Sequence, residues 1–178
     1  MDAPSATREA ILQAACRVVI ESGASHMTLE TVAREAGVSK GGLLYHFPSK
    51  EALVGGMIEY LNGTFNARIH QVYAQDEGPA RGRWLRAFVS STFSSDQVDV
   101  SAGLLAAVAL NPELLASNRA NYQAWQQKFE ADGLDSAQAT IIRLAADGLW
   151  FTELLGFAPL EESLRSAVFN ILIEMTRE

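Results

Sequence analysis

Residues 28–53 read TLETVAREAGVSKGGLLYHFPSKEAL. Apolar residues recur at helical spacing on both sides of Gly37, where a glycine suits a tight turn. The pair Gly41 and Gly42 weakens the second segment, because each Gly costs about 1 kcal/mol relative to Ala inside a helix. Pro48 then ends that segment. The sequence therefore predicts two short helices, of which the second needs support from its neighbours.

Two short helices joined by a glycine-containing turn and packed on a longer first helix make a helix-turn-helix. Residues 7–22 carry the apolar stripe of such a first helix. Four side chains are expected to face outward on the second short helix: Lys40, Leu44, Tyr45 and His46. Amines and hydroxyls suit phosphates, and an apolar edge suits a thymine methyl. The same pattern also fits a structural helix-turn-helix in which Tyr45 and His46 are half-buried packing residues.

Helical spacing continues through the rest of the chain, and no alternating run with hairpin turns indicates a strand. Ser49 is expected to cap a long fourth helix, and a loop follows at residues 76–79. About five more helices are expected, near residues 84–93, 101–110, 112–129, 136–155 and 160–175. The predicted fold class is all-α. A three-helix helix-turn-helix domain, residues 1–52, is joined by the long fourth helix to a helical-bundle domain, residues 53–178.

The charge is unevenly distributed along the chain. The 178 residues carry 14 Lys and Arg against 21 Asp and Glu, a net charge of −7. The first 50 residues hold five of each sign, so the whole excess of acid lies in the later part. The neutral residues 1–50 are compatible with a nucleic-acid partner. The acidic residues 51–178 indicate either a second function or a solvated acidic surface.

Several functional classes find no support in the sequence. We see no glycine-rich phosphate loop and no nucleophile elbow, so no enzyme activity and no cofactor are expected. His26, His46 and His70 are scattered without metal-ligand spacing, so no metal site is expected. No apolar run could cross a bilayer and no signal peptide is evident. The lone Cys16 fits a reducing compartment, and we expect a cytoplasmic protein without a membrane partner.

The N-terminal third resembles the DNA-binding domain of TetR-type transcriptional regulators. The resemblance covers residues 7–55 and is specific because many residue types fall at fixed offsets. The matching features are Gly23, Thr28-Leu29, Ala36-Gly37-Val38-Ser39, Lys40-Gly41, Leu43, Tyr45, Phe47, Ser49-Lys50-Glu51 and Leu53. Beyond residue 60 the likeness is one of size and helix order only.

The resemblance implies a homodimer whose two short third helices enter successive major grooves of a palindromic DNA operator. Such proteins are mostly repressors that a small-molecule effector releases by binding the C-terminal domain. Carried over by position, the implied phosphate contacts are Thr28, Ser39, Tyr45 and Lys50. The implied contacts at base edges or the groove wall are Lys40, Gly41, Leu44 and His46. Gly42 departs from the family pattern, which often has a longer side chain there, so direct base readout is expected to be thinner.

Aromatic residues concentrate after residue 75, where all three tryptophans lie. Aromatics at helical spacing are most often plain core, and as a set they could also line an apolar pocket between helices. The candidate ligand-binding residues are Phe88, Leu105, Val108, Tyr122, Trp125 and Trp150. The candidate polar anchors are Asn118, Asn121 and Asp147, and the alternative for each is plain surface exposure.

The last two helices are the candidate dimer surface. Small residues permit close helix approach and leucines supply apolar area, so two helices from each subunit would form a four-helix bundle. The candidate interface residues are Ala145, Leu149, Leu164, Val168, Ile171 and Leu172. The alternative is that the same stripes pack inside one subunit, and some of them must.

Three functional classes remain open on the sequence: a ligand-responsive DNA-binding repressor, a helical small-molecule binding protein, and a protein-interaction module with a structural helix-turn-helix. A second glycine pair, Gly55 and Gly56, lies in the predicted fourth helix. Close packing of another helix against these glycines would explain them, and so would a hinge between the two domains.

Overall fold

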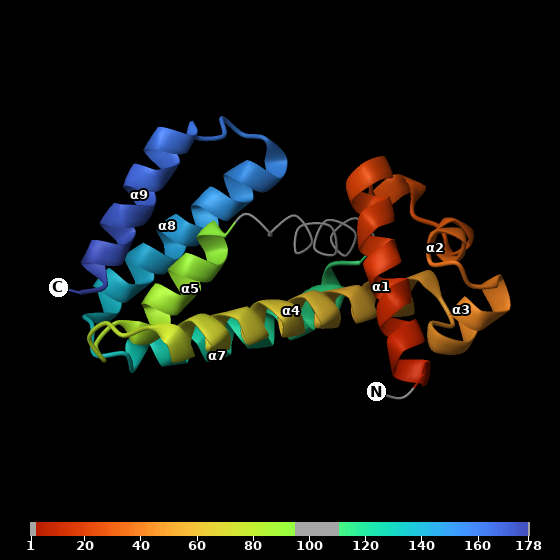
Figure 1. Cartoon of the computed structure of the whole chain (residues 1–178), viewed down its shortest axis with the longest axis horizontal. Coiled ribbons are helices and arrows are strands. Elements are labelled where there is room, and N and C mark those ends of the chain that lie inside the picture. Colours follow the sequence, from red (N-terminus) through yellow and green to blue (C-terminus); the bar gives the residue numbers. More distant parts are fainter. Residues whose placement is uncertain (1–2, 95–110, 178) are drawn as a thin grey trace. The chain divides into compact units, whose positions relative to one another are not determined.

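The computed structural model describes residues 3–94 and 111–177. These residues form eight α-helices and two short 3-10 helices, and no strand occurs among them (Figure 1). The all-α prediction is therefore confirmed. The helix expected near residues 101–110 lies outside the described residues.

The chain divides into two compact units. Among the described residues, the head comprises residues 3–64 and 111–119, and the body comprises residues 65–94 and 120–177. The long helix α4 (Lys50–Gln75) contributes residues to both units. The predicted boundary between residues 52 and 53 separates the helix-turn-helix domain from the helical-bundle domain by function. The two compact units divide the chain by packing, so the functional boundary stays a prediction.

The head begins with α1 (Ala3–Ser22) and the 3-10 turn η1 (Ala24–His26), followed by α2 (Leu29–Glu35) and α3 (Lys40–His46). Figure 1 shows α2 and α3 beside α1, and α1 contacts α2 directly. Thr28 caps α2, and Ser39 caps α3 by accepting a hydrogen bond from the Gly42 amide at 3.0 Å. Between the two helices Gly37 has φ 68°, the left-handed conformation that glycine adopts without strain. The predicted helix-turn-helix is thus present.

A continuous apolar core holds the short helices in place. Leu43 and Phe47 anchor α3 in it, at 0% and 2% exposure. The 3-10 helix η3 (Pro112–Leu115) packs Leu114 and Leu115 against the same core. The buried residues of this core are Ile11, Leu12, Ala14, Ala15, Cys16, Val19, Met27, Val32, Ala33, Leu43, Phe47, Leu53, Val54, Met57, Ile58 and Leu61.

The glycine pair in α4 has two different environments. A Cβ added to Gly56 would lie 2.6 Å from a ring carbon of Phe47 and 3.3 Å from Leu12. A Cβ added to Gly55 would meet nothing within 4 Å. Gly56 is therefore required by close packing, as one of the two readings of the sequence proposed, whereas packing does not explain Gly55.

The body contains α5 (Arg83–Phe93), most of α7 (Ala116–Glu130), α8 (Ser136–Leu155) and α9 (Glu162–Met175). Within this unit α5 lies against α8 and α9 (Figure 1). Its buried apolar residues are Ile69, Leu85, Ala87, Phe88, Val89, Phe93, Trp125, Phe129, Leu134, Ala139, Ile142, Ala146, Leu149 and Leu172.

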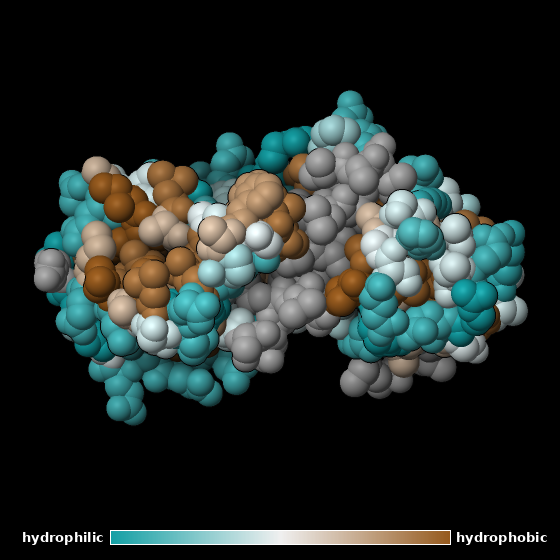
Figure 2. Space-filling model, turned by 90° about the horizontal axis from the view of Figure 1, so that it is seen from above, coloured by the Kyte–Doolittle hydropathy of each residue, from teal (hydrophilic) through white to brown (hydrophobic). Residues whose placement is uncertain are grey.

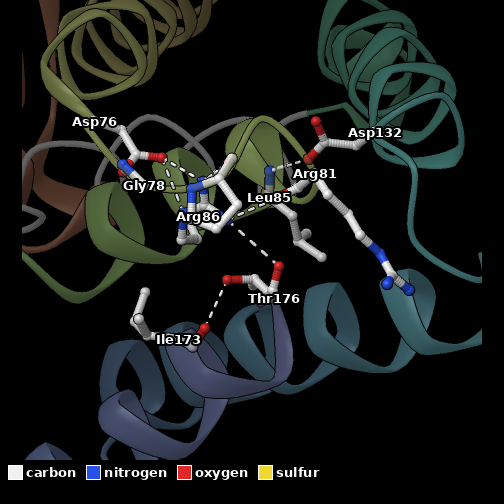
Figure 3. A network of polar contacts seen from close by, with 9 residues as sticks. Asp76, Gly78, Arg81, Leu85, Arg86, Asp132, Ile173 and Thr176 are labelled. Atoms are coloured by element: carbon white, nitrogen blue, oxygen red, sulfur yellow. Dashed lines mark hydrogen bonds and ion pairs between the residues drawn. The ribbon is translucent and has the colours of Figure 1, made fainter. Parts of the chain in front are cut away.

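A buried arginine ties the ends of several body segments together (Figure 3). The side chain of Arg86 is 5% exposed and pairs with Asp76 at 2.7 Å. It also donates to the backbone carbonyls of Pro79, Arg81 and Thr176. Burial alone would raise the pKa of Asp76, but the hydrogen bonds from Arg86 and the Gly78 amide hold it below its ordinary value. The carboxylate therefore stays ionised opposite the guanidinium.

A second set of contacts fixes the start of α5. Asp132, from the segment between α7 and α8, accepts a hydrogen bond from the Leu85 amide at 2.9 Å through its side chain. Its backbone carbonyl accepts one from Gly82. Gly82 has φ 70°, and a Cβ there would lie 2.1 Å from the carbonyl oxygen of Thr176. Asp132 therefore caps α5 from a distant part of the chain. The Thr176 carbonyl leaves room only for glycine at position 82.

The two glycines of α4 give a paired stability test. We expect Gly55→Ala to stabilise the head by about 1 kcal/mol, because alanine is the better helix former and no atom obstructs its methyl group. Gly56→Ala should destabilise the head, because overpacking of about 1–3 kcal/mol outweighs that gain. Hydrogen exchange of the buried α1 amides measures both effects. Equal protection in the two variants would contradict the packing account of Gly56.

Arg86 offers a second test, in the body. Replacing it with Met leaves Asp76 without its cationic partner and several carbonyls without their donor, so we expect a loss of about 3–5 kcal/mol. Urea unfolding followed by tryptophan fluorescence reports on the body, which holds all three tryptophans. Arg177→Met is the control: its pair with Glu174 is about half exposed, so a change within about 1 kcal/mol is expected. Similar midpoints for the two variants would show that the Arg86 network does not hold the body together.

Candidate nucleic-acid interface, ligand-binding residues and dimer surface

One face of α3 is exposed and carries most of the predicted DNA contacts. Lys40, Gly41, Leu44 and Tyr45 are all exposed, and their spacing places them together on this short helix. Tyr45 is 81% exposed, which is unusual for a large aromatic side chain that serves only packing. His46 is half-buried, and the Tyr45 ring meets the His46 ring edge-on. The face thus offers an amine, a phenol and an apolar edge to a partner.

Two of the three predicted hydroxyl contacts, Thr28 and Ser39, also serve as helix caps. Thr28 Oγ1 accepts from the Thr31 amide at 3.1 Å, within a reciprocal capping box. Ser39 Oγ accepts from the Gly42 amide. A serine hydroxyl has one proton and two acceptor lone pairs, so capping leaves the proton of Ser39 available to a phosphate oxygen. Capping and phosphate binding are therefore compatible at this residue.

The structure places an acidic partner beside Lys40 that we did not identify in the sequence. Lys40 Nζ pairs with Glu30 Oε1, which lies in the first turn of α2. These two residues are ten positions apart in the chain, and the turn at Gly37 between α2 and α3 brings them together. Lys50, the first residue of α4, is half-buried beside the Ser49 cap.

The two glycines of α3 differ in how closely an added Cβ would approach the capping hydroxyl of Ser39. A Cβ at Gly42 would lie 3.3 Å from Ser39 Oγ, so a side chain there would crowd the capping hydroxyl. A Cβ at Gly41 would be 4.0 Å from the same atom, an ordinary contact. The caps of α2 and α4 accommodate side chains at the equivalent position, Thr31 and Ala52, so the cap alone does not require glycine at position 42. Gly41 is exposed on the proposed DNA face.

Three of the candidate ligand-binding residues lie together in the body. The rings of Phe88 and Trp125 are 5.6 Å apart, and those of Tyr122 and Trp125 are 4.9 Å apart. Phe65, which we did not name from the sequence, joins them with its ring 5.4 Å from Trp125. Trp150 is half-buried on α8. Leu105 and Val108 lie outside the described residues.

Polar groups border this aromatic cluster. The Tyr122 hydroxyl donates to Asp147 at 3.2 Å, and Arg143 pairs with the same carboxylate at 2.7 Å. Burial raises the pKa of Asp147, and the pairing with Arg143 opposes that shift. The Trp125 indole donates to Asn66 Oδ1 at 2.7 Å. The cluster therefore combines aromatic surface with hydrogen-bonding groups, as small-molecule sites do.

Both α8 and α9 carry an exposed apolar stripe beside the stripe that they bury. Figure 2 shows apolar side chains gathered on the body where α8 and α9 lie in Figure 1. Residues 141, 144, 148, 151 and 155 of α8 follow helical spacing on its exposed side, as do residues 164 and 171 of α9. The large exposed apolar residues of this surface, the α8/α9 stripe, are Ile141, Leu144, Phe151, Leu155, Phe157, Leu164 and Ile171.

The candidate dimer residues divide between this stripe and the core. Leu164 and Ile171 are more than half exposed, Val168 is half-buried, and Ala145 is exposed. Leu149 and Leu172 are 7% and 5% exposed because they pack in the core of the same body, so they offer little area to a partner. Our proposed dimer surface therefore excludes Leu149 and Leu172 and gains Ile141, Leu144 and Phe151.

The described residues contain neither a cluster of metal ligands nor a helix suited to a membrane. No group of three or more His, Cys, Asp or Glu side chains in this part of the chain could hold a metal ion. Within residues 3–94 and 111–177, none of the helices combines the length and apolar character needed to cross a membrane.

Two family models match the chain. One is described as "Bacterial regulatory proteins, tetR family" and matches residues 11–57. The other is described as "Tetracyclin repressor-like, C-terminal domain" and matches residues 82–177, more than half of the chain. The first match includes every residue of the exposed α3 face.

Among curated proteins, the nucleoid occlusion factor SlmA of Vibrio cholerae is 35% identical over 71 residues. That match covers 39% of this chain and 36% of SlmA, so only about a third of the relative's length is matched. Among solved structures, a transcriptional regulator from Rhodococcus sp. superposes with a TM-score of 0.76 at 22% identity, covering 95% of each chain. The multidrug binding protein EbrR complexed with ethidium superposes with a TM-score of 0.66 at 23% identity, covering 96% of this chain and 98% of EbrR. These structures share the fold.

Proposed function

Because the chain belongs to the TetR family of bacterial regulatory proteins, we propose that it is a homodimeric transcriptional repressor. In this proposal a small apolar or amphipathic effector, bound by the body, releases the dimer from a palindromic operator. The observation that carries the proposal is the exposed face of α3, which presents Lys40, Leu44 and Tyr45 on a helix too short to be stable alone.

The chemistry of that face supports contact with duplex DNA. In a helix-turn-helix the second helix lies in the major groove, with its N-terminal residues at base edges. Lys40 is the first residue of α3, so we propose that its amine reaches base acceptors and that Leu44, one turn later, supplies an apolar edge. Thr28, Ser39, Tyr45 and Lys50 supply hydroxyls and an amine for phosphates on either side. Gly41 and His46 complete the proposed contact surface.

The α8/α9 stripe supports the homodimer. Seven large apolar side chains are exposed on it, far more than isolated surface residues would explain. A second copy is the partner that we propose, because a two-fold axis would bring the same stripe of each subunit together as a four-helix bundle. Two copies also place two α3 helices on one duplex, as a palindromic operator requires.

The body supports the effector role. The rings of Phe65, Phe88, Tyr122 and Trp125 form an aromatic cluster in the core of the body, with Asp147 at its polar border. EbrR, whose fold this chain shares, is described as a multidrug binding protein and was crystallised with ethidium. By analogy with that fold, we propose an aromatic or amphipathic effector for this chain. Helix α4 contributes to both the head and the body, so it is the segment through which we propose that the effector acts.

DNA binding is tested by fluorescence anisotropy with duplexes selected from a random library by the full-length protein. Tyr45→Phe removes the exposed hydroxyl and Lys50→Ala removes an amine, so both should weaken binding. For Lys50→Ala the slope of log affinity against log salt should fall by about two per dimer, one for each lost phosphate contact.

Arg177→Ala is the matched control for that experiment. It removes one positive charge from the body, which carries none of the proposed DNA contacts, and should leave the slope unchanged. Salt-insensitive binding, or no selected sequence, would overturn the repressor and favour a helix-turn-helix that is structural only.

The dimer is tested by placing a charge on the α8/α9 stripe. We expect Ile171→Glu and Leu164→Glu to convert the protein to a monomer, because each buries a carboxylate in the proposed interface. Sedimentation velocity measures the mass directly. Ile20→Glu, at an exposed apolar position of the head, should leave the dimer intact. A dimer that persists in both stripe variants would refute this interface.

A further inference from the structure

The ion pair between Glu30 and Lys40 joins the starts of the two short helices on the face proposed to meet DNA. Glu30 lies in the first turn of α2, and Lys40 opens α3. Their side chains are 61% and 56% exposed, so the pair is open to a partner. An exposed pair contributes little to stability, so folding alone gives a weak reason for it.

Glu30 carries its negative charge at neutral pH. The hydrogen bond from Lys40 holds the pKa of the Glu30 carboxyl below its ordinary value. An ionised carboxylate close to DNA is repelled by phosphates, and it also neutralises Lys40 as a phosphate contact. On an interface that merely held the DNA backbone, Glu30 would therefore weaken binding to every sequence.

The two side chains together present an acceptor next to a donor. In the major groove a C·G pair offers the N4 amino group of cytosine beside the O6 and N7 acceptors of guanine. Carboxylates accept from cytosine N4, and lysine donates to guanine O6 and N7. An A·T pair suits the two side chains less well, because its acceptors lie on either side of the adenine amino group and a methyl group flanks one of them.

We propose that Glu30 and Lys40 jointly read one C·G base pair in each half of the operator. Glu30 accepts from cytosine N4, and Lys40 donates to the guanine of the same pair. Glu30 is then a specificity-determining residue on the first helix of the motif, and it disfavours every site without that cytosine. This inference rests on the proposed DNA-binding function.

The experiment uses the full-length protein and the duplexes that it selects from a random library. We expect the selected half-sites to share a C·G pair at one fixed position. Replacing that pair by A·T should weaken binding of the native protein about tenfold or more. Glu30→Gln should weaken this preference, because a neutral amide is a poorer acceptor than a carboxylate and its NH2 group can donate instead. It should also bind non-selected DNA more tightly, because it removes the repelling charge. Lys40→Met should lose the same preference.

Glu35→Gln is the matched control. Glu35 lies on the same helix, and its carboxylate pairs with Arg17 of α1 at 2.8 Å rather than with α3. The substitution changes the net charge equally and should retain the C·G preference. If Glu30→Gln keeps the preference, or Glu35→Gln loses it to the same extent, the inference fails while DNA binding stands. If the native protein selects no sequence at all, the proposed function fails and this inference falls with it.

Discussion

The contact on which the head depends is the ring of Phe47 against the backbone of Gly56. Phe47 is the residue that ends α3, and Gly56 lies in the second turn of α4, where no side chain could be accommodated beneath the ring. Phe47 is 2% exposed, and the guanidinium of Arg8 on α1 lies over its ring, 5.1 Å from the centroid. One aromatic side chain thus fixes the short α3 against the two long helices of the head. Because α3 is only seven residues long, this anchoring replaces the stability that the helix lacks by itself.

Much of the head could be predicted from local chemistry. Thr28 and Ser39 are strong N-cap residues, Gly37 suits a left-handed turn, and Pro48 cannot continue a helix. These signals are short-range, so they can be read without knowing what packs against what. The different roles of Gly55 and Gly56 could not be predicted, because they depend on Phe47, which lies nine positions before Gly56 at the end of another helix.

The body shows where sequence patterns are insufficient. Periodicity indicates that α8 and α9 are amphipathic, but each has two apolar stripes, and the pattern does not say which faces inward. Leu149 and Leu172, which we predicted for the interface, pack in the core of the body, whereas Ile141, Leu144 and Phe151, which we did not name from the sequence, are exposed. The Arg86 network is beyond sequence reasoning for a different reason. Its contacts reach a carbonyl 90 positions away, and no local signal marks a backbone oxygen as the partner of an arginine.

In α3, the residues that anchor the helix differ from the residues proposed to contact DNA. Leu43 and Phe47 hold α3 from below, so the side chains at positions 40, 44 and 45 can change without disturbing the core. Ser39 is the exception, because one hydroxyl both caps α3 and remains able to donate to a phosphate. Its cap orients the hydroxyl before DNA arrives, which lowers the entropy lost on binding. The Glu30–Lys40 pair is proposed to act in the same way on base edges. Each side chain restrains the other, so the donor and the acceptor are already adjacent before DNA binds. The pair itself adds little to the stability of the fold.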